Sequence, residues 1–257
     1  MIPMRVILKL LAGFFPLFVF LAANGSDLLA QQKLPKTSPP EQPGMSLRAA
    51  ASPARPEALL DPMSPEWSRL TLQRVALNRT PRLYDTEAPS ELEIPFVDLR
   101  LARAGGKLVV QMIWRDPTQD AAQIAKLPAA PTEGRPHKEL TEATDRFFDS
   151  AAVMHPARLP QDDTWPSLQM GDTGQPVSIY FWNASRGAAR MQAEGRSTTK
   201  RTGESFPAQA LYKGGAWNVT MELQDVPAGM PLAFAIWNGS QQDRDGRKYF
   251  TTWLRLE

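Results

Sequence analysis

The stretch from residue 231 to residue 257 reads PLAFAIWNGSQQDRDGRKYFTTWLRLE and joins a strand pattern, a turn and a second strand pattern. Leu232, Phe234 and Ile236 alternate with other residues, which is typical of a β-strand with one face on a core. The asparagine, aspartate and glycine residues between 238 and 246 are typical of a turn. We therefore expect a β-hairpin whose second strand spans residues 248–256.

The second strand pattern begins with a lysine. Lys248 has the same even parity as Phe250, Leu254 and Leu256, so the alternation predicts that its side chain belongs to the inward-facing row. A lysine in that position must reach water along its stem, find a partner, or lose its proton and act as a neutral amine ligand. A lysine at a strand end can also protect a sheet edge against aggregation. The residues alone leave these alternatives open.

Short strand patterns fill most of the chain upstream of this hairpin. Residues 107–114 follow a Gly-Gly turn and are apolar on both faces, which indicates a central strand. Pro95 favours an edge position for the strand at 92–99. No long segment has the 3.6-residue period of a helix, so the sequence predicts an all-β sandwich or barrel. The other expected strands are 69–77, 147–154, 177–182, 216–223 and 232–237.

Two long excursions interrupt these strand patterns. Residues 116–145 contain two short helical patterns, AAQIAKL and KELTEATD, and residues 187–208 are polar. Long loops on a compact sheet domain are usually functional, so we expect both excursions to line a pocket or a partner surface.

The N-terminal part of the chain differs in composition from the rest. Residues 1–25 combine Arg5 and Lys9 with an apolar run and small residues, which is typical of a secretory signal peptide, with an uncleaved anchor as the alternative. The segment lacks a twin-arginine pair, so we expect export by a Sec-type route. Residues 26–65 are rich in proline and predict an extended arm or linker without ladders or helices, either a tether or a segment that wraps a partner. One domain is expected over residues 66–257.

The composition excludes several classes of protein. The chain has 257 residues with 29 basic and 27 acidic side chains, a balance that does not favour nucleic-acid binding. It has no cysteine, which excludes disulfides, iron–sulfur clusters on this chain, covalently attached c-type haem and a catalytic thiol. No G-x-S-x-G motif is present, and with two histidines no hydrolase constellation stands out.

The segments DSAAVMHPARLP, AFAIWNG and DGRKYFTTW occur in this order in the family that the chain resembles. The chain is similar, over about residues 67–257, to the haem-binding gamma subunits of ethylbenzene dehydrogenase, dimethyl sulfide dehydrogenase, chlorate reductase and selenate reductase, which carry a cytochrome c-552/DMSO reductase-like haem-binding domain. The resemblance implies an immunoglobulin-like or DOMON-like β-sandwich. It also implies a haem b whose iron is held by Met154 and Lys248, with Met170 and Gly171 behind the haem.

The residues by themselves rank the candidate ligands differently. Imidazole is the commoner axial ligand, so His155 comes before Met154 on residue type alone, whereas the resemblance favours Met154. The two are consecutive, so an extended backbone points them to opposite faces. His137 lies in a loop pattern, where a solvated histidine is the simpler interpretation.

The resemblance implies a non-catalytic, periplasmic electron-transfer subunit. Its partners would be the iron–sulfur beta subunit and the molybdopterin alpha subunit of a DMSO reductase-family enzyme, and possible redox partners include a soluble c-type cytochrome. Two alternatives stay open: a periplasmic copper-binding protein that uses methionines and His155, and an exported carbohydrate-binding module. The module would expose, as sugar platforms, the rings of Trp165, Trp182, Trp237 and Trp253.

Overall fold

The computed structural model describes residues 46–80, 92–121, 147–161 and 164–257. These residues form two β-sheets that face each other, so the predicted β-sandwich is confirmed. The expected signal peptide at 1–25 and the first part of the arm, up to residue 45, lie outside the described residues. The two helical patterns expected between 116 and 145 lie there as well, except for Ala121, the first residue of AAQIAKL.

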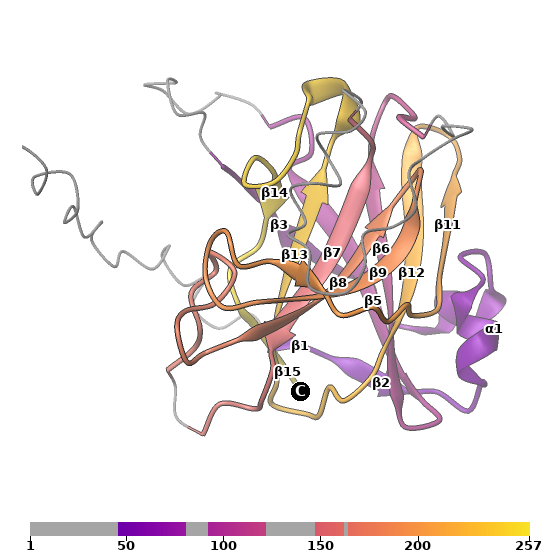
Figure 1. The fold of residues 1–257 in the computed structure, drawn as a ribbon. Coiled ribbons are helices and arrows are strands. Elements are labelled where there is room, and N and C mark those ends of the chain that lie inside the picture. The colour runs from indigo at the N-terminus through magenta and orange to yellow at the C-terminus, as the bar shows by residue number, and fades with distance from the viewer. Residues whose placement is uncertain (1–45, 81–91, 122–146, 162–163) are drawn as a thin grey trace, which may run out of the picture. The chain divides into compact units, whose positions relative to one another are not determined.

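The first sheet has nine strands in the order β1-β15-β13-β7-β8-β9-β10, and β14 lies on β13 with β4 beside it. Figure 1 shows β13, β7, β8 and β9 running next to one another. The strands are β1 (Ser46–Leu47), β4 (Asn78–Arg79), β7 (Ser150–Pro156), β8 (Val177–Asn183), β9 (Gly187–Ala193), β10 (Lys200–Arg201), β13 (Pro231–Trp237), β14 (Tyr249–Phe250) and β15 (Leu254–Leu256).

The second sheet has six strands in the order β11-β12-β6-β5-β2, with β3 paired to β5. Its strands are β2 (Ala49–Ala51), β3 (Gln73–Ala76), β5 (Phe96–Ala104), β6 (Lys107–Arg115), β11 (Ala208–Tyr212) and β12 (Ala216–Leu223). The helices among the described residues are α1 (Pro56–Leu60), η1 (Pro65–Arg69) and η2 (Gly239–Gln241). None of these three has the length and apolar character that crossing a membrane requires.

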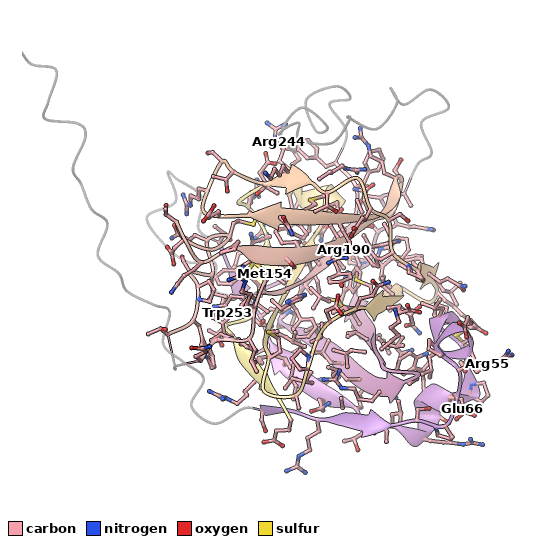
Figure 2. The ribbon with its side chains drawn as sticks, turned by 60° about the horizontal axis from the view of Figure 1, so that its bottom comes forward. Arg55, Glu66, Met154, Arg190, Arg244 and Trp253 are labelled. Carbon is pink, nitrogen blue, oxygen red and sulfur yellow. The ribbon has the colours of Figure 1, made fainter. Side chains whose placement is uncertain are left out.

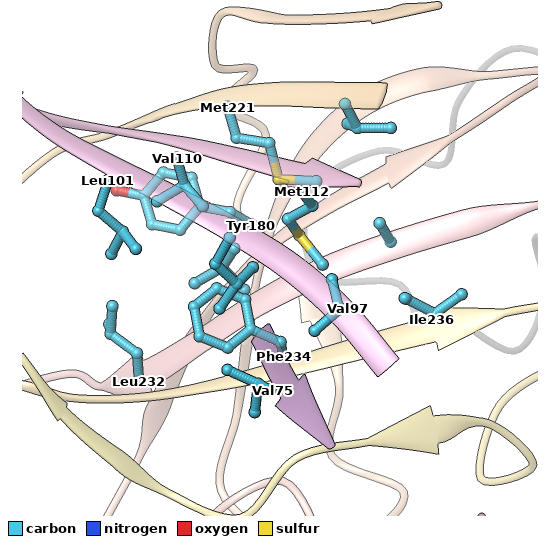
Figure 3. Close-up of a cluster of buried hydrophobic side chains, with 14 of the residues drawn as sticks. Val75, Val97, Leu101, Val110, Met112, Tyr180, Met221, Leu232, Phe234 and Ile236 are labelled. Atoms are coloured by element: carbon cyan, nitrogen blue, oxygen red, sulfur yellow. The ribbon is translucent and has the colours of Figure 1, made fainter. Parts of the chain in front are cut away.

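The main core lies between the two sheets. Phe234 and Ile236 of β13 and Met112 of β6 are fully buried in one apolar cluster, as Figure 3 shows. The rings of Trp182 and Trp217, one from each sheet, meet edge to face with their centroids 5.0 Å apart. Burial of such side chains is the dominant favourable term in folding, so this interface carries most of the stability of the sandwich.

The strand predictions for the second sheet are confirmed in one case and wrong in another. Strand β6 is central, between β12 and β5, as predicted. Strand β5 is not an edge strand, because β6 pairs with one side of it and β2 and β3 pair with the other. Pro95 directly precedes β5 and so removes no hydrogen bond from its ladder.

The later part of the proline-rich segment also departs from expectation. Between residues 46 and 65 it contains β1, which pairs parallel to β15, and β2, which pairs parallel to β5. Pro56 and Pro65 lie in the first turns of α1 and η1, where a missing N–H breaks no helical hydrogen bond. Leu59 of α1 is fully buried. The expectation of no ladder and no helix is therefore wrong over this part.

The polar excursion at 187–208 is not a continuous loop, because it contains the strands β9 and β10. Strand β9 pairs with β8 over its whole length, and β10 returns along β9. Ala189, Met191 and Ala193 of β9 are buried and alternate with Arg190 and Gln192. The pattern was missed because alanine contributes little hydrophobic signal, although the alternation is regular.

The predicted hairpin at 231–257 is confirmed, but its second strand is interrupted. Ala235 pairs with Phe250 and Leu232 pairs with Leu254, so β13 advances three residues while its partner advances four. One extra residue is a β-bulge, which reverses the facing of residues on its two sides. Leu254 and Leu256 therefore face the main core together with Tyr249, and Phe250 faces the other way. The predicted shared row of Lys248, Leu254 and Leu256 is wrong for this reason.

Candidate functional site

A second apolar cluster lies on the outer face of the nine-stranded sheet. Its buried members come from β7, β8, β9 and β13, and partly exposed side chains pack against them. We call this set the outer cluster. Its buried members are Ala152, Val177, Ile179, Ala189, Met191, Ala193 and Trp237, and its partly exposed members are Met154, Met170, Phe181, Ala235 and Trp253. Figure 2 labels Met154 and Trp253, which lie near each other on this face.

Met154 and Lys248 both project onto this outer face. Met154 of β7 packs against the outer cluster and pairs with Ala233 of β13. Lys248 directly precedes β14, and its Nζ lies 5.5 Å from the ring centroid of Trp237, a buried member of the cluster. The strands β14 and β7 flank β13 on its two sides. The facing predicted for Lys248 is wrong, since its side chain points away from the main core.

The floor between these two side chains is made of alanines. Ala235 and Ala152 pair with each other and belong to the outer cluster, and Ala233 pairs with Met154. Strands β7 and β14 lie on either side of β13, so their backbones are about 10 Å apart. Met154 lies level with Ala233 of β13 and Lys248 lies level with Trp237, which is about 13 Å further along that strand. The thioether and the amine thus stand at opposite ends of a floor of small side chains, and the larger ring of Trp237 borders this floor at the amine end.

Lys248 has an unusual environment for a lysine. Within the described part of the chain, no hydrogen-bond acceptor or carboxylate contacts its Nζ, and the side chain is half-buried beside Trp237. The pKa of Lys248 is lowered from 10.5 to about 8, mainly by burial and also by the nearby charge of Arg196, against an opposing effect of Asp245. At pH 7 the side chain is therefore mostly protonated, but its neutral fraction, about a tenth, is far larger than that of an ordinary lysine.

His155 lies on the opposite face of β7, as the alternation predicted. It is buried beside Tyr180 of the main core, and the two ring centroids are 5.9 Å apart. Its Nδ1 lies 2.6 Å from the carbonyl oxygen of Pro156, and its Nε2 is buried without a hydrogen-bond partner. Burial lowers the pKa of His155. The structure thus separates His155 from Lys248 by the thickness of the sheet. His137 lies outside the described residues.

Met170 and Gly171 form a tight turn at the border of the outer cluster. Met170 packs against the cluster and has φ +74°, a left-handed conformation that is uncommon for a non-glycine residue. Such outliers cluster at functional sites. Gly171 has φ +81°, and a Cβ there would lie 2.6 Å from the carbonyl oxygen of Gln175. Gly171 thus lets one part of the backbone approach another, and Met170 reaches the cluster from this turn.

The two glycines of this turn allow a matched test. We expect Gly171→Ala to lower the free energy of unfolding by at least about 1 kcal/mol more than Gly174→Ala. Gly174 has a similar φ of +79°, but a Cβ there would meet nothing within 4 Å, so it isolates the cost of the backbone conformation. Urea unfolding of both variants measures the difference. Equal losses of stability would show that the close approach at Gly171 is not a constraint.

Sequence reasoning named Trp237 and Trp253 as sugar platforms, but it did not place them, or Phe181, on this face. Phe181 and Trp237 meet edge to face with ring centroids 5.4 Å apart, and Trp253 Nε1 donates a hydrogen bond to the carbonyl oxygen of Pro166. Trp182 and Trp237 are buried, which contradicts the exposed sugar platforms that a carbohydrate-binding module would require. The period-two parity of Phe181 and Trp237 within their strands was the signal that could have placed them on one face.

A buried acidic group at one end of the sandwich was also missed. Asp149 is fully buried and accepts hydrogen bonds from the backbone N–H groups of Gly239 and Asp120 and from Trp217 Nε1. Asp116 is fully buried nearby, and burial, with the charge of Asp149, raises its pKa to about 7. Among the described residues, no group of three histidine, cysteine or acidic side chains has an arrangement that could hold a metal ion.

The sequence matches no family model. It is 26% identical over 207 residues to a protein of Haloferax mediterranei whose name assigns it provisionally as a respiratory nitrate reductase heme subunit. The match covers 76% of this chain and 67% of that protein.

Two further relatives carry a subunit name. The chain is 29% identical over 168 residues to the chlorate reductase subunit gamma of Ideonella dechloratans, a match that covers 60% of this chain and 61% of that protein. It is 26% identical over 210 residues to the dimethylsulfide dehydrogenase subunit gamma of Rhodovulum sulfidophilum, covering 73% of this chain and 71% of the relative. The resemblance found in the sequence is confirmed, and the chain is related to the gamma subunits of these reductases and dehydrogenases.

Proposed function

We propose that the chain is a b-type haem electron-transfer subunit, with Met154 and Lys248 as the axial ligands of the haem iron. The observation that carries this proposal is the placement of a thioether and a partly buried amine at opposite ends of an alanine floor on one face of the sheet. Among the described residues the amine has no hydrogen-bond or ion-pair partner. A flat ligand can stand on a floor of small side chains, whereas larger residues would fill that space.

The chemistry of the two donors fits haem iron. Methionine sulfur is a known axial ligand that raises the reduction potential, and a lysine binds a metal only after it has lost its proton. The lowered pKa of Lys248 reduces the free energy needed to remove that proton. A haem held by these two donors would supply one-electron transfer rather than a binding position for a substrate.

Other residues of this face would support the pair. Trp237 lies beside Lys248 Nζ, and Phe181 packs against Trp237, so the two rings reduce the contact of the amine with water. Met170 reaches the same cluster from its left-handed turn and would contact the flat ligand rather than its iron. His155 takes no part in this arrangement, because it faces the main core.

The subunit role follows from the relatives. The names of two of them state that they are gamma subunits, one of a reductase and one of a dehydrogenase. By analogy this chain would pass electrons between an iron–sulfur beta subunit, next to a molybdopterin alpha subunit, and a carrier such as a soluble c-type cytochrome. It would do so in the periplasm after Sec-type export, without carrying out the substrate reaction itself.

Haemin titration of the purified full-length chain tests this function. We expect one haem per chain, a low-spin b-type spectrum, and a reversible one-electron change on reduction by dithionite and reoxidation. No spectral change on addition of haemin would contradict the proposal. A spectrum of free haemin with no saturation would contradict it equally.

A further inference from the structure

The loop between β13 and Lys248 is held in place by the buried carboxylate of Asp243. Asp243 is fully buried, and Arg79 of β4 donates to its two oxygens at 2.6 and 2.5 Å in a bidentate pair. The backbone N–H of Asn238 donates to the same carboxylate at 3.1 Å, and Arg247 Nε lies 3.3 Å from it. One carboxylate thus joins the start of the loop, its end and the neighbouring strand.

The same cluster holds both residues adjacent to Lys248. Arg247, which precedes it, is ion-paired with Asp243. Tyr249, which follows it, is buried, and the Arg79 guanidinium lies 4.3 Å from its ring centroid. Lys248 lies in a bend directly before β14, between these two held residues, so the cluster limits the directions that its side chain can take.

The backbone of Lys248 is held from the same strand. Thr80, the residue after Arg79, donates to the carbonyl oxygen of Lys248 from its backbone N–H at 3.0 Å and from its hydroxyl at 3.1 Å. The lysine ammonium itself has no hydrogen-bond or ion-pair partner among the described residues, and at its own end it meets the ring of Trp237. Its placement depends on these backbone and neighbour contacts.

We propose that the Arg79–Asp243 pair positions Lys248: it keeps this side chain on the outer face and orients it toward a bound ligand. This inference rests on the proposed haem function. Arg79 and Asp243 touch neither donor atom, so they are positioning residues. Removing Arg79 takes away the two shortest contacts of the buried Asp243 carboxylate and leaves it with Arg247 and the Asn238 N–H, which loosens the segments that the pair joins. Sequence alone gives no sign of the pair, because its members are 164 residues apart.

The test compares Arg79→Met with Arg74→Met. Arg74 also forms a bidentate pair, with Asp98 on the other sheet, and so serves as the matched control. In the haem-free chain, hydrogen exchange of the amides from 238 to 250 is expected to accelerate at least about tenfold in Arg79→Met and to stay unchanged in Arg74→Met. In the haem-loaded chain, Arg79→Met is expected to shift most of the haem to high spin and to change its midpoint potential.

A second variant covers the case in which Arg79→Met does not fold. Arg79→Lys keeps the charge but loses the bidentate fork, so we expect a smaller change in exchange and a mixed-spin spectrum. A folded Arg79 variant with accelerated exchange but a wild-type spectrum and potential would overturn the positioning role. Unchanged exchange would overturn it as well. The exchange measurement needs no haem. It therefore distinguishes a failure of the positioning role of Arg79 from a failure of the wild-type chain to bind haem.

Discussion

Replacing Lys248 with methionine is expected to stabilise the haem-free chain at pH 7 by about 2 kcal/mol. Burial lowers the pKa of this lysine from 10.5 to about 8, and each pKa unit corresponds to about 1.4 kcal/mol, so the full difference would be about 3 kcal/mol. We take the smaller figure because the residue keeps some contact with water. Methionine retains the apolar stem and removes the charge.

The pH dependence of this effect has a definite sign. Between pH 8 and pH 10.5 the unfolded chain holds the Lys248 proton more tightly than the folded chain, so the stability of the wild type rises with pH in this window. The advantage of Lys248→Met is therefore expected to be full below pH 8 and to disappear above about pH 10.5. Urea unfolding at several pH values measures it, with the exposed Lys213 as the control in Lys213→Met. An advantage that did not change with pH would contradict the assignment to the ammonium.

Asp149→Ala is expected to lower the free energy of unfolding by about 3–4 kcal/mol. The fully buried carboxylate accepts from Gly239 N at 2.9 Å, from Asp120 N at 2.8 Å and from Trp217 Nε1 at 2.9 Å. Each buried donor left without an acceptor costs about 1–3 kcal/mol. Burial raises the pKa of Asp149, so removing the charge offsets part of this loss.

Thermal unfolding measures this effect, and a midpoint lower by roughly 10 °C is expected for a domain of this size. The matched control is Asp98→Ala, which removes a carboxylate paired with the exposed side chain of Arg74 and should cost less than about 1 kcal/mol. Equal losses in the two variants would show that Asp149 does not link the two sheets through Trp217 and the loop at Gly239.

Much of the fold could be predicted from period-two alternation. The strands at 107–114, 216–223 and 232–237 carry large apolar residues at alternate positions or on both faces, and the structure has strands there. The short strands β1, β2 and β4 could not be predicted, since segments of two or three residues show no period. Their existence depends on pairing with distant strands, which is a tertiary effect.

The candidate site was predicted in part. The consecutive positions of Met154 and His155 correctly predicted opposite faces, because that inference needs only local geometry. The facing predicted for Lys248 was wrong because the bulge before Leu254 reverses which face the later residues point to. Parity read from a single sequence cannot detect such an extra residue. The alanine floor and the Arg79–Asp243 pair became visible only when strands distant in sequence were brought together.

The measurement that tests the central claim most directly is the oxidised and dithionite-reduced visible spectrum of the haem-loaded chain, recorded for wild type, Met154→Ala and Lys248→Ala. Met170→Ala and Lys213→Ala serve as controls, since Met170 packs on the same cluster and Lys213 is exposed. We expect a low-spin b-type spectrum for wild type and both controls, and a high-spin spectrum for both ligand variants. A low-spin spectrum that survives in Met154→Ala or in Lys248→Ala would contradict this pair of ligands.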